Sequence, residues 1–315
     1  MDIKLYPALS FYQIGQRGNQ EDARYPDTDT PAADCTTFVV CDGVGGLDKG
    51  EIASRTVAES IGHSMAAYDG SEVFTDSDFA KVLATAYADL AKRNTGTGEG
   101  MATTLTFMHV HAGGVFVAHI GDSRIYQIRE GVGVVYRSYD HSLVNVLVRT
   151  GNLSPADAVD HPQSNIITRC MGGPDPNRHD AANVFNIVDV RSGDYFLMCS
   201  DGVLHQLTDE GLVELLCSSA TDGEKMAQLA SIAAPSTDNN TAMLVHIAEV
   251  SGNEADDSAD VDSADEEDCT GCDTHIIEVP APQAHDVAPD ANATEEPAPA
   301  ESGSKISRFF RNLFK

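Results

Sequence analysis

Short runs of β-branched and aromatic residues recur along the first 250 residues and predict strands. Two consecutive pairs of runs are separated by short segments, residues 111–114 with Gly113-Gly114 in one and Gly121-Asp122 in the other. This spacing is typical of hairpins, so it favours antiparallel pairing over a series of parallel units. The predicted strands are 10–15, 36–41, 104–110, 115–120, 123–128, 194–199 and 242–247.

Between these runs, apolar residues recur at helical spacing. Ser77 and Thr208 stand where a side chain caps the start of a helix. Because the helices fall in pairs between blocks of strands, the pattern predicts an α+β fold of stacked layers. The predicted helices are 49–67, 77–93, 141–150, 208–218 and 222–233.

A change in composition marks a boundary near residue 250. Residues 251–304 hold sixteen Asp or Glu and no Lys or Arg, and they are rich in Ala, Pro and Ser. Such a segment buries too little apolar surface to offset the entropy cost of ordering it. We therefore expect residues 1–250 to form the folded domain and 251–304 to be a disordered acidic tether.

The last eleven residues, 305–315, differ from the tether before them. Their four basic residues and their apolar residues alternate at helical spacing, which predicts a basic amphipathic helix. A helix of this length reaches about 16 Å, too short to span a bilayer. The alternatives are binding to an anionic membrane surface, binding in a groove on a partner, or packing on its own domain.

The overall charge excludes one class of function. Among 315 residues, 49 are acidic and 20 basic, giving a formal charge of -29, so we expect no nucleic acid partner. The opening residues lack the pattern of a signal peptide, and no apolar run is long enough for a membrane span. The seven cysteines look like reduced core residues, which favours a cytoplasmic protein.

Acidic residues lie where the predicted strands begin or end. If the sheets bring these ends together, the carboxylates repel one another unless cations bind between them. Ligation by oxygen alone indicates a hard cation, Mg²⁺ or Mn²⁺. For each acid taken singly, a turn remains an open alternative, because Asp-Gly is common in turns. The residues are Glu21, Asp22, Asp42, Asp122, Asp201 and Asp238.

Seven motifs in this order resemble those of the metal-dependent type 2C protein serine/threonine phosphatases, in their compact bacterial form. They cover roughly residues 10–248, which makes the resemblance specific. The motifs are Arg17-Gly-Asn19-Gln-Glu21-Asp22, Asp42-Gly43-Val-Gly45-Gly46, Gly100-Met-Ala-Thr103-Thr104, Gly121-Asp122-Ser123-Arg124, Asp140-His141-Ser142-Leu143-Val144, Ser200-Asp201-Gly202 and Asp238-Asn239-Asn-Thr241-Ala242.

The resemblance implies a four-layer α/β/β/α sandwich, with two antiparallel sheets flanked by helix pairs. It also implies an enzyme that hydrolyses phosphoserine and phosphothreonine in phosphoproteins by attack of a metal-activated water, opposing Ser/Thr kinases in signalling. We expect a cytoplasmic monomer, which the segment 305–315 could bring to the inner membrane as a peripheral protein. The cofactors implied are two core ions, Mg²⁺ or Mn²⁺, and a possible third.

The resemblance also assigns metal ligands. Asp42 would bridge the two core ions, and the carbonyl of Gly43 would bind one of them. Asp201 and Asp238 would complete the protein ligands of the other ion. Asp122, with Asp201, would hold the third and weaker ion.

Three further residues receive catalytic roles from the resemblance. Glu21 would act through metal-bound water, and Asp22 would orient waters around the ions. Arg17 would grip the substrate phosphate, for which a guanidinium fork is suited; a salt bridge from Arg17 to Glu21 is the alternative. Val44 stands where many relatives have His, so the proton of the leaving group would come from water or another side chain.

The rival hypotheses are a catalytically silent phosphoprotein-binding module and a membrane-tethered scaffold. A silent module would be expected to lose some of Asp42, Asp201 and Asp238, and all three are present.

Other motifs are weaker. Residues 140–142 (Asp-His-Ser) favour helix capping over a hydrolase triad, because adjacent side chains point in different directions. Cys269 and Cys272 with His275 show only part of a zinc-site spacing. Residues 151–165 are either a flap beside the active site or a surface loop without function.

Overall fold

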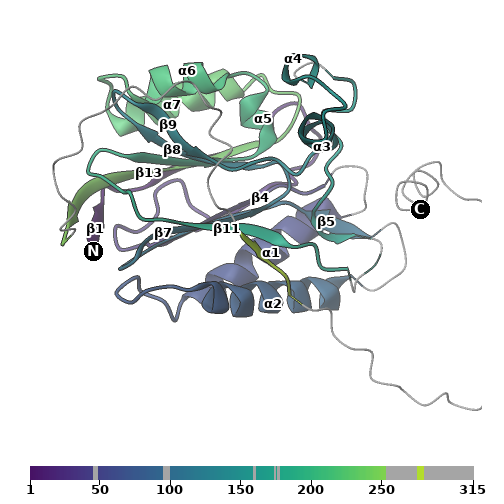
Figure 1. The fold of residues 1–315 in the computed structure, drawn as a ribbon, viewed down its shortest axis with the longest axis horizontal. Coiled ribbons are helices and arrows are strands. Elements are labelled where there is room, and N and C mark those ends of the chain that lie inside the picture. The colour runs from purple at the N-terminus through teal and green to yellow at the C-terminus, as the bar shows by residue number, and fades with distance from the viewer. Residues whose placement is uncertain are drawn as a thin grey trace, which may run out of the picture. The chain divides into compact units, whose positions relative to one another are not determined.

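Two antiparallel sheets lie face to face in the computed structural model (Figure 1). In the part of the chain that is described, one sheet has the strand order β1-β13-β12-β8-β9, with β2 also paired to β13. Its strands are β1 (Asp2–Leu5), β2 (Leu9–Gln13), β8 (Arg124–Arg129), β9 (Gly133–Arg137), β12 (Tyr195–Cys199) and β13 (Asn240–Ser251). We call it the first sheet.

The second sheet has the order β14-β11-β7-β6-β4-β3. Its strands are β3 (Ala23–Tyr25), β4 (Thr37–Cys41), β6 (Leu105–His111), β7 (Gly114–Ile120), β11 (Ala182–Ile187) and β14 (His275–Ile277). A short antiparallel ribbon pairs β5 (Met101–Thr103) with β10 (Met171–Gly173).

A helix pair covers the outer face of each sheet (Figure 1). Helices α1 (Gly50–Met65) and α2 (Asp76–Arg93) cover the second sheet, and α6 (Asp209–Leu216) and α7 (Asp222–Ala233) cover the first. The shorter helices are α3 (Leu143–Arg149), α4 (Pro155–Ala158) and α5 (Asp201–Leu204). The predicted α/β/β/α sandwich is confirmed.

The structure describes residues 1–44, 49–94, 100–158, 161–173, 175, 178–252 and 275–279. All of these belong to the unit Met1–Ala281. The predicted helix 305–315, both cysteines of the Cys269 and Cys272 motif, and most of the predicted tether 251–304 lie outside the described residues. Within the described ranges, no helix has the length and apolar character needed to cross a bilayer.

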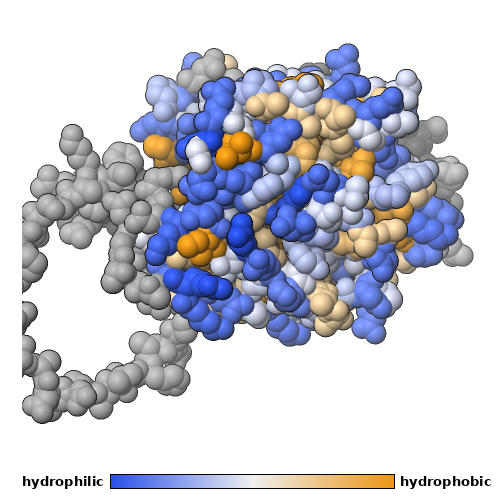
Figure 2. All heavy atoms as spheres, turned by 180° about the vertical axis from the view of Figure 1, so that it is seen from behind, coloured by the Kyte–Doolittle hydropathy of each residue, from blue (hydrophilic) through white to orange (hydrophobic). Residues whose placement is uncertain are grey.

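Burial on both faces explains why the central strands read as continuous apolar runs. Every residue of β4 is buried. Val39 and Cys41 belong to the core under α1 and α2, whereas Phe38 and Val40 belong to the core between the sheets. On the outside, one face of the molecule shows mainly hydrophilic side chains with scattered hydrophobic ones (Figure 2).

The hairpin predicted at Gly121-Asp122 is wrong. Strand β7 pairs with β6 and β11 on its two sides, so it has no free edge for β8. With a φ of 106° at Gly121, the chain turns away and β8 joins the first sheet instead. The hairpin predicted at Gly113-Gly114 is confirmed by the pairing of β6 with β7.

One of the two predicted helix caps is also wrong. Helix α2 is capped by Thr75, not by Ser77, and Thr75 shares a reciprocal capping box with Asp78. At α6, the hydroxyl of Thr208 accepts a hydrogen bond from the backbone N–H of Gly211, as predicted.

Part of the segment predicted to be a disordered tether, residues 251–304, forms a strand, β14. Strand β14 pairs with β11, and its Ile277 side chain is 8% exposed in the core under α1 and α2. The apolar residues Ile276, Ile277 and Val279 are clustered inside an acidic segment, so a short strand has side chains to bury where its surroundings do not.

Candidate metal centre

The predicted acidic residues interact electrostatically in the folded chain. Asp42 directly follows β4, and burial raises its pKa well above the usual range. Repulsion by Asp22, Asp201, Asp122 and Asp238 raises the pKa of Asp42 further. The topology therefore brings carboxylates from five separate segments into one electrostatic cluster.

Two glycines beside these acids allow the chain segments to approach closely. A Cβ atom on Gly43 would lie 2.6 Å from the carbonyl carbon of Gly50 and 2.7 Å from the carbonyl oxygen of Glu21. A Cβ atom on Gly202 would lie 2.0 Å from the carbonyl oxygen of Asn239. The Asp-Gly pairs are thus required by packing between segments as well as by the local turns.

Asp22 is buried, and only one of its two carboxylate oxygen atoms has a hydrogen-bond partner among the described residues. It is 2% exposed, and its Oδ2 atom accepts a hydrogen bond from Ser200 Oγ at 2.9 Å. Its Oδ1 atom has no hydrogen-bond partner among the described residues. Burial, opposed by the hydrogen bond from Ser200 and helped by repulsion from Asp201, raises the pKa of Asp22 to about 7.

Hydrogen bonds with Thr103 at the end of β5 and with Thr104, between β5 and β6, fix the backbone of Asp42. Its N–H donates to Thr104 Oγ1 at 2.9 Å, and its carbonyl accepts from Thr103 Oγ1 at 2.8 Å. The Thr104 hydroxyl also lies 2.8 Å from Ser123 Oγ, next to Asp122. The segments that carry Asp42 and Asp122 are therefore joined through one threonine.

The carboxyl groups of Asp122 and Asp201 both have raised pKa values. Burial, with repulsion from Asp201 and Asp140, raises the pKa of Asp122 to about 8. Burial also raises the pKa of Asp201, and its Oδ1 atom has no hydrogen-bond partner in the described part of the chain. His205 Nε2 lies 3.7 Å from Asp201 Oδ2.

Arg17 forms an ion pair with one of the predicted ligands. Its Nη2 atom lies 2.5 Å from Asp238 Oδ2, while Asp238 Oδ1 accepts the N–H of Asn239 at 2.9 Å. In the described residues Arg17 thus pairs with Asp238 rather than with Glu21, the alternative that the sequence left open. About half of the Arg17 side chain is exposed, so it is accessible to a ligand.

Sequence reasoning gave no role to Asn239, which holds two segments of the site together. Its Oδ1 atom accepts the N–H of Glu21 at 2.8 Å, and its Nδ2 donates to the carbonyls of Ile14 and Asn19, each at 2.9 Å. Asn239 is buried and directly follows Asp238. A buried amide in a motif next to a candidate ligand is the signal that could have identified it.

The donor set suits a hard cation. Carboxylate oxygens are the ligands that Mg²⁺ and Mn²⁺ prefer, and buried oxygen atoms of Asp22 and Asp201 are without partners. Among the described residues, no three His, Cys, Asp or Glu side chains converge closely enough to hold an ion as they stand. Binding of an ion by Asp238 would require its release from Arg17.

The segment Asp140-His141-Ser142 does not form a triad. Asp140 forms a double ion pair with Arg124, with both N–O distances 2.7 Å, so its predicted capping role is wrong. Ser142 caps α3 by accepting the N–H of Asn145, as predicted. His141 Nδ1 accepts the N–H of Gly121 at 3.1 Å, which supports the turn before Asp122.

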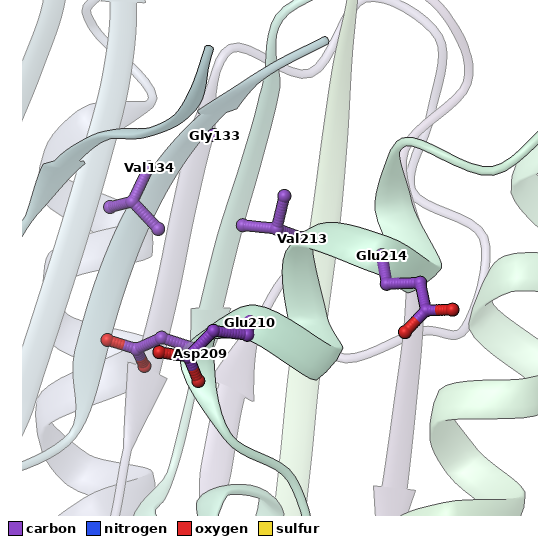
Figure 3. Close-up of a pocket in the computed structure, with 6 residues that line it drawn as sticks. All are labelled: Gly133, Val134, Asp209, Glu210, Val213 and Glu214. Carbon is purple, nitrogen blue, oxygen red and sulfur yellow. The ribbon is translucent and has the colours of Figure 1, made fainter. Parts of the chain in front are cut away.

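A surface pocket of about 400 Å³ lies between β9 and α6 (Figure 3). None of the predicted site residues lines it. The lining residues are Gly133, Val134, Asp209, Glu210, Val213 and Glu214. This pocket is therefore distinct from the carboxylate cluster.

Comparison with known proteins identifies the family. The family described as Protein phosphatase 2C matches residues 17–233. The chain is 33% identical over 245 residues to "Protein phosphatase PhpP" of Streptococcus pneumoniae, covering 75% of this chain and 95% of that protein. The crystal structure of the serine/threonine phosphatase PstP/Ppp of Mycobacterium tuberculosis matches with a TM-score of 0.65 and 26% identity, covering 78% of this chain and 100% of that one.

The catalytic domain of PstP has also been solved in complex with two manganese ions. It matches with a TM-score of 0.61 and 24% identity over 79% of this chain and all of that one, a likeness of fold alone. The chain belongs to the protein phosphatase 2C family, which is metal-dependent. It is a protein serine/threonine phosphatase of the bacterial type.

Proposed function

We propose that the carboxylate cluster holds two Mg²⁺ or Mn²⁺ ions and a weaker third, and that they serve hydrolysis of phosphoserine and phosphothreonine. The observation that carries this proposal is the mutual repulsion of the buried Asp22 and the half-buried Asp42, Asp122 and Asp201. Among the described residues, Asp22 and Asp201 each also have an oxygen atom without a hydrogen-bond partner. A fold keeps such a cluster at a cost in stability unless bound cations offset it.

Five residues would hold the ions. Asp42, the carbonyl of Gly43, Asp201 and Asp238 would bind the two core ions, and Asp122 with Asp201 would bind the third. Bound divalent ions supply a nucleophile at neutral pH by lowering the pKa of water, and they stabilise charge on the phosphoryl oxygens.

Glu21 and Asp22 act one step further from the phosphate. The N–H of Glu21 donates to Asn239, and its carbonyl accepts the N–H of Gly43 at 3.0 Å. The backbone of Glu21 is therefore joined to the segments that carry two of the proposed ligands. Asp22 keeps one free oxygen atom while Ser200 fixes the other. In this proposal both carboxylates accept hydrogen bonds from ordered water, and the unpartnered oxygen atom of Asp22 supports that role.

Arg17 would bind the substrate phosphate through its guanidinium fork. The ion pair with Asp238 keeps the side chain near the cluster in the absence of substrate. If Asp238 held an ion, its Oδ2 atom would leave Arg17, and the guanidinium would then be free to bind the phosphate. Because the side chain of Val44 has no transferable proton, the proton of the leaving alkoxide would come from water or another side chain.

An assay of the full chain on a phosphothreonine peptide tests this proposal. We expect turnover with Mn²⁺ or Mg²⁺ and none after EDTA treatment, with recovery when the ion is restored. Asp201→Asn should remove turnover at low metal concentration without unfolding the protein. Turnover that persists in EDTA, or a fully active Asp201→Asn variant, would contradict the metal assignment.

We propose separately that residues 305–315 bring the enzyme to anionic membranes, where its phosphoprotein substrates would be concentrated. The four basic residues and the apolar face of this segment support the proposal. Flotation with anionic liposomes tests it. Equal recovery of the full chain and a Phe309→Glu, Phe310→Glu variant would exclude the membrane role.

A further inference from the structure

Strand β14 fills the outer edge of the second sheet. It pairs antiparallel with β11, with Ile277 opposite Ala182 and His275 opposite Val184. Without β14, β11 would be the edge strand and would expose unpaired backbone N–H and C=O groups. Such an edge can bind an extended segment by strand addition.

Side chains give this edge a preference for one face of the added strand. Ile277 is 8% exposed and belongs to the same buried cluster as Ala182 and Val184. Val279, two residues further on, packs against that cluster on the same face. Ile276 points to the other face and is 53% exposed. The edge therefore recognises apolar side chains at alternate positions.

Polar contacts fix both ends of the segment along α2. His275 Nε2 forms an ion pair with Asp76 Oδ2 in the first turn of α2. The carbonyl of Val279 lies 3.2 Å from His179 Nδ1, and the His179 ring stacks on Tyr87 of α2 at 4.1 Å. The register of the segment is thus set by its two ends as well as by Ile277.

A series of backbone contacts connects residues 275–279 to Gly43, one of the proposed metal ligands. His179, which contacts Val279, forms a β-bridge with Met171 in β10. Strand β10 pairs with β5, and Thr103 at the end of β5 forms a β-bridge with Gly43. Loss of the contact at Val279 would therefore loosen the support of the β5–β10 ribbon.

We propose that the edge of β11 is a peptide-docking surface, that residues 275–279 are a detachable motif which occupies it in cis, and that this docking steadies the β5–β10 ribbon beside Gly43. Only three residue pairs join β14 to β11, and only Ile277 in the strand is buried. So short a strand stays bound because it is covalently attached to the domain, which gives it a high effective concentration.

Amide hydrogen exchange on the full chain tests the cis docking. In Ile277→Asp, we expect the amides of Ala182–Val184 and of the β5–β10 ribbon to exchange at least tenfold faster than in the wild type. Ile276→Asp is the matched control, because it adds the same charge on the exposed face, and it should exchange like the wild type. Unchanged β13 amides will show that Ile277→Asp is folded.

The two halves of the proposal fail separately in this experiment. Equal exchange in all three proteins would show that the segment does not protect β11. Faster exchange confined to Ala182–Val184 would overturn the support of the β5–β10 ribbon.

A labelled peptide of residues 273–281, with the sequence DTHIIEVPA, tests docking in trans by fluorescence anisotropy. It should bind the full-length Ile277→Asp chain at least tenfold more tightly than the wild type, whose edge is already filled. The same peptide carrying Ile277→Asp should not bind. Equal affinity for both chains would refute the docking surface, as would no binding to the variant chain titrated to about 1 mM, the order of concentration that a flexible tether supplies. Neither measurement uses turnover, so a failure of the docking proposal can be distinguished from a failure of the proposed function.

Discussion

Two buried acidic residues have opposite surroundings: Asp194 directly precedes β12 of the first sheet, and Asp22 directly precedes β3 of the second. Asp194 is 0% exposed and accepts hydrogen bonds from Arg129 at 2.7 and 2.8 Å, from Gln127 Nε2 at 2.8 Å, and from the N–H of Arg191 at 2.9 Å. Asp22 is 2% exposed, has no ion pair among the described residues, and leaves one oxygen atom unpartnered.

This difference distinguishes carboxylates that stabilise the fold from carboxylates that we propose bind cations. A buried carboxylate that serves stability is paired and fully hydrogen-bonded, because an unsatisfied one costs free energy of unfolding. Near Asp42, by contrast, Asp22 and Asp201 each have one oxygen atom without a partner among the described residues, and the acids repel one another. The fold therefore pays in stability for a site that a cation can complete.

The largest expected effect follows from Asp42→Asn. Removal of the charge proposed to bridge the core ions should lower kcat by at least about 1000-fold, because metal ions supply several kcal/mol of transition-state stabilisation. Without metal, the variant should be as stable as the wild type or more stable, since one repelling charge is gone. Steady-state kinetics, Mn²⁺ calorimetry and thermal melting in EDTA measure these effects. A large loss of stability in EDTA would show that Asp42 stabilises the fold, as Asp194 does.

The opposite result is expected at the structural acid. Asp194→Asn should lower the free energy of unfolding by about 3–5 kcal/mol, because it leaves the buried Arg129 with a broken ion pair. Urea unfolding measures this loss. The folded fraction should keep the Mn²⁺ affinity of the wild type, and a weakened affinity would show that the two regions are coupled.

Substitution of Arg17 should separate phosphate binding from metal binding. Arg17→Ala should raise KM for a phosphopeptide about 10- to 100-fold, the loss expected for a charge-assisted pair, with Mn²⁺ affinity retained. Arg17→Lys should restore part of the binding, because it keeps the charge without the fork. If Arg17→Ala lost its metals while folded, Arg17 would be a structural partner of the cluster.

Asp122→Ala should have a smaller effect. The proposed third ion has fewer protein ligands than the core ions, so its loss should lower kcat about tenfold at saturating Mn²⁺. Two tightly bound ions should remain, as counted by metal analysis after desalting. Loss of both core ions would place Asp122 in the core instead.

The smallest effect is a pH dependence of stability in EDTA. The folded-state pKa values of Asp22 and Asp122, about 7 and 8, lie above their unfolded values. The folded state therefore binds more protons than the unfolded state between pH 4 and 8, and stability falls as pH rises through this range. We expect a loss of about 1 kcal/mol or more, measured by urea unfolding, and saturating Mn²⁺ should reverse it. A rise of stability with pH in EDTA would contradict the cluster.

Local patterns predicted the elements well where a single segment determines them. The helix 222–233 has the predicted bounds, and the runs of buried strands matched because burial on both faces shows in the sequence. Pairing between distant segments could not be predicted in this way. Gly121-Asp122 reads as a hairpin, yet the turn leads to the other sheet because both sides of β7 are occupied.

The same limit applies to the site. The Asp-Gly motifs and the family resemblance predicted the acidic cluster, because each acid stands at a strand end. The pairing of Arg17 with Asp238 and the role of Asn239 depend on contacts between residues more than 200 positions apart, which no local pattern records. Strand β14 was missed because three apolar residues in an acidic segment are too few to predict a strand.

The position of β13 determines when the enzyme can become active during its synthesis. This strand pairs with β1 and β2 from the start of the chain and with β12 on its other side. The first sheet therefore cannot close until residue 251 has left the ribosome, and Asp238 reaches the site in the same step. A nascent chain that already displays Arg17, Asp42 and Asp201 thus remains without its last proposed ligand, so folding of the catalytic domain and acquisition of activity coincide.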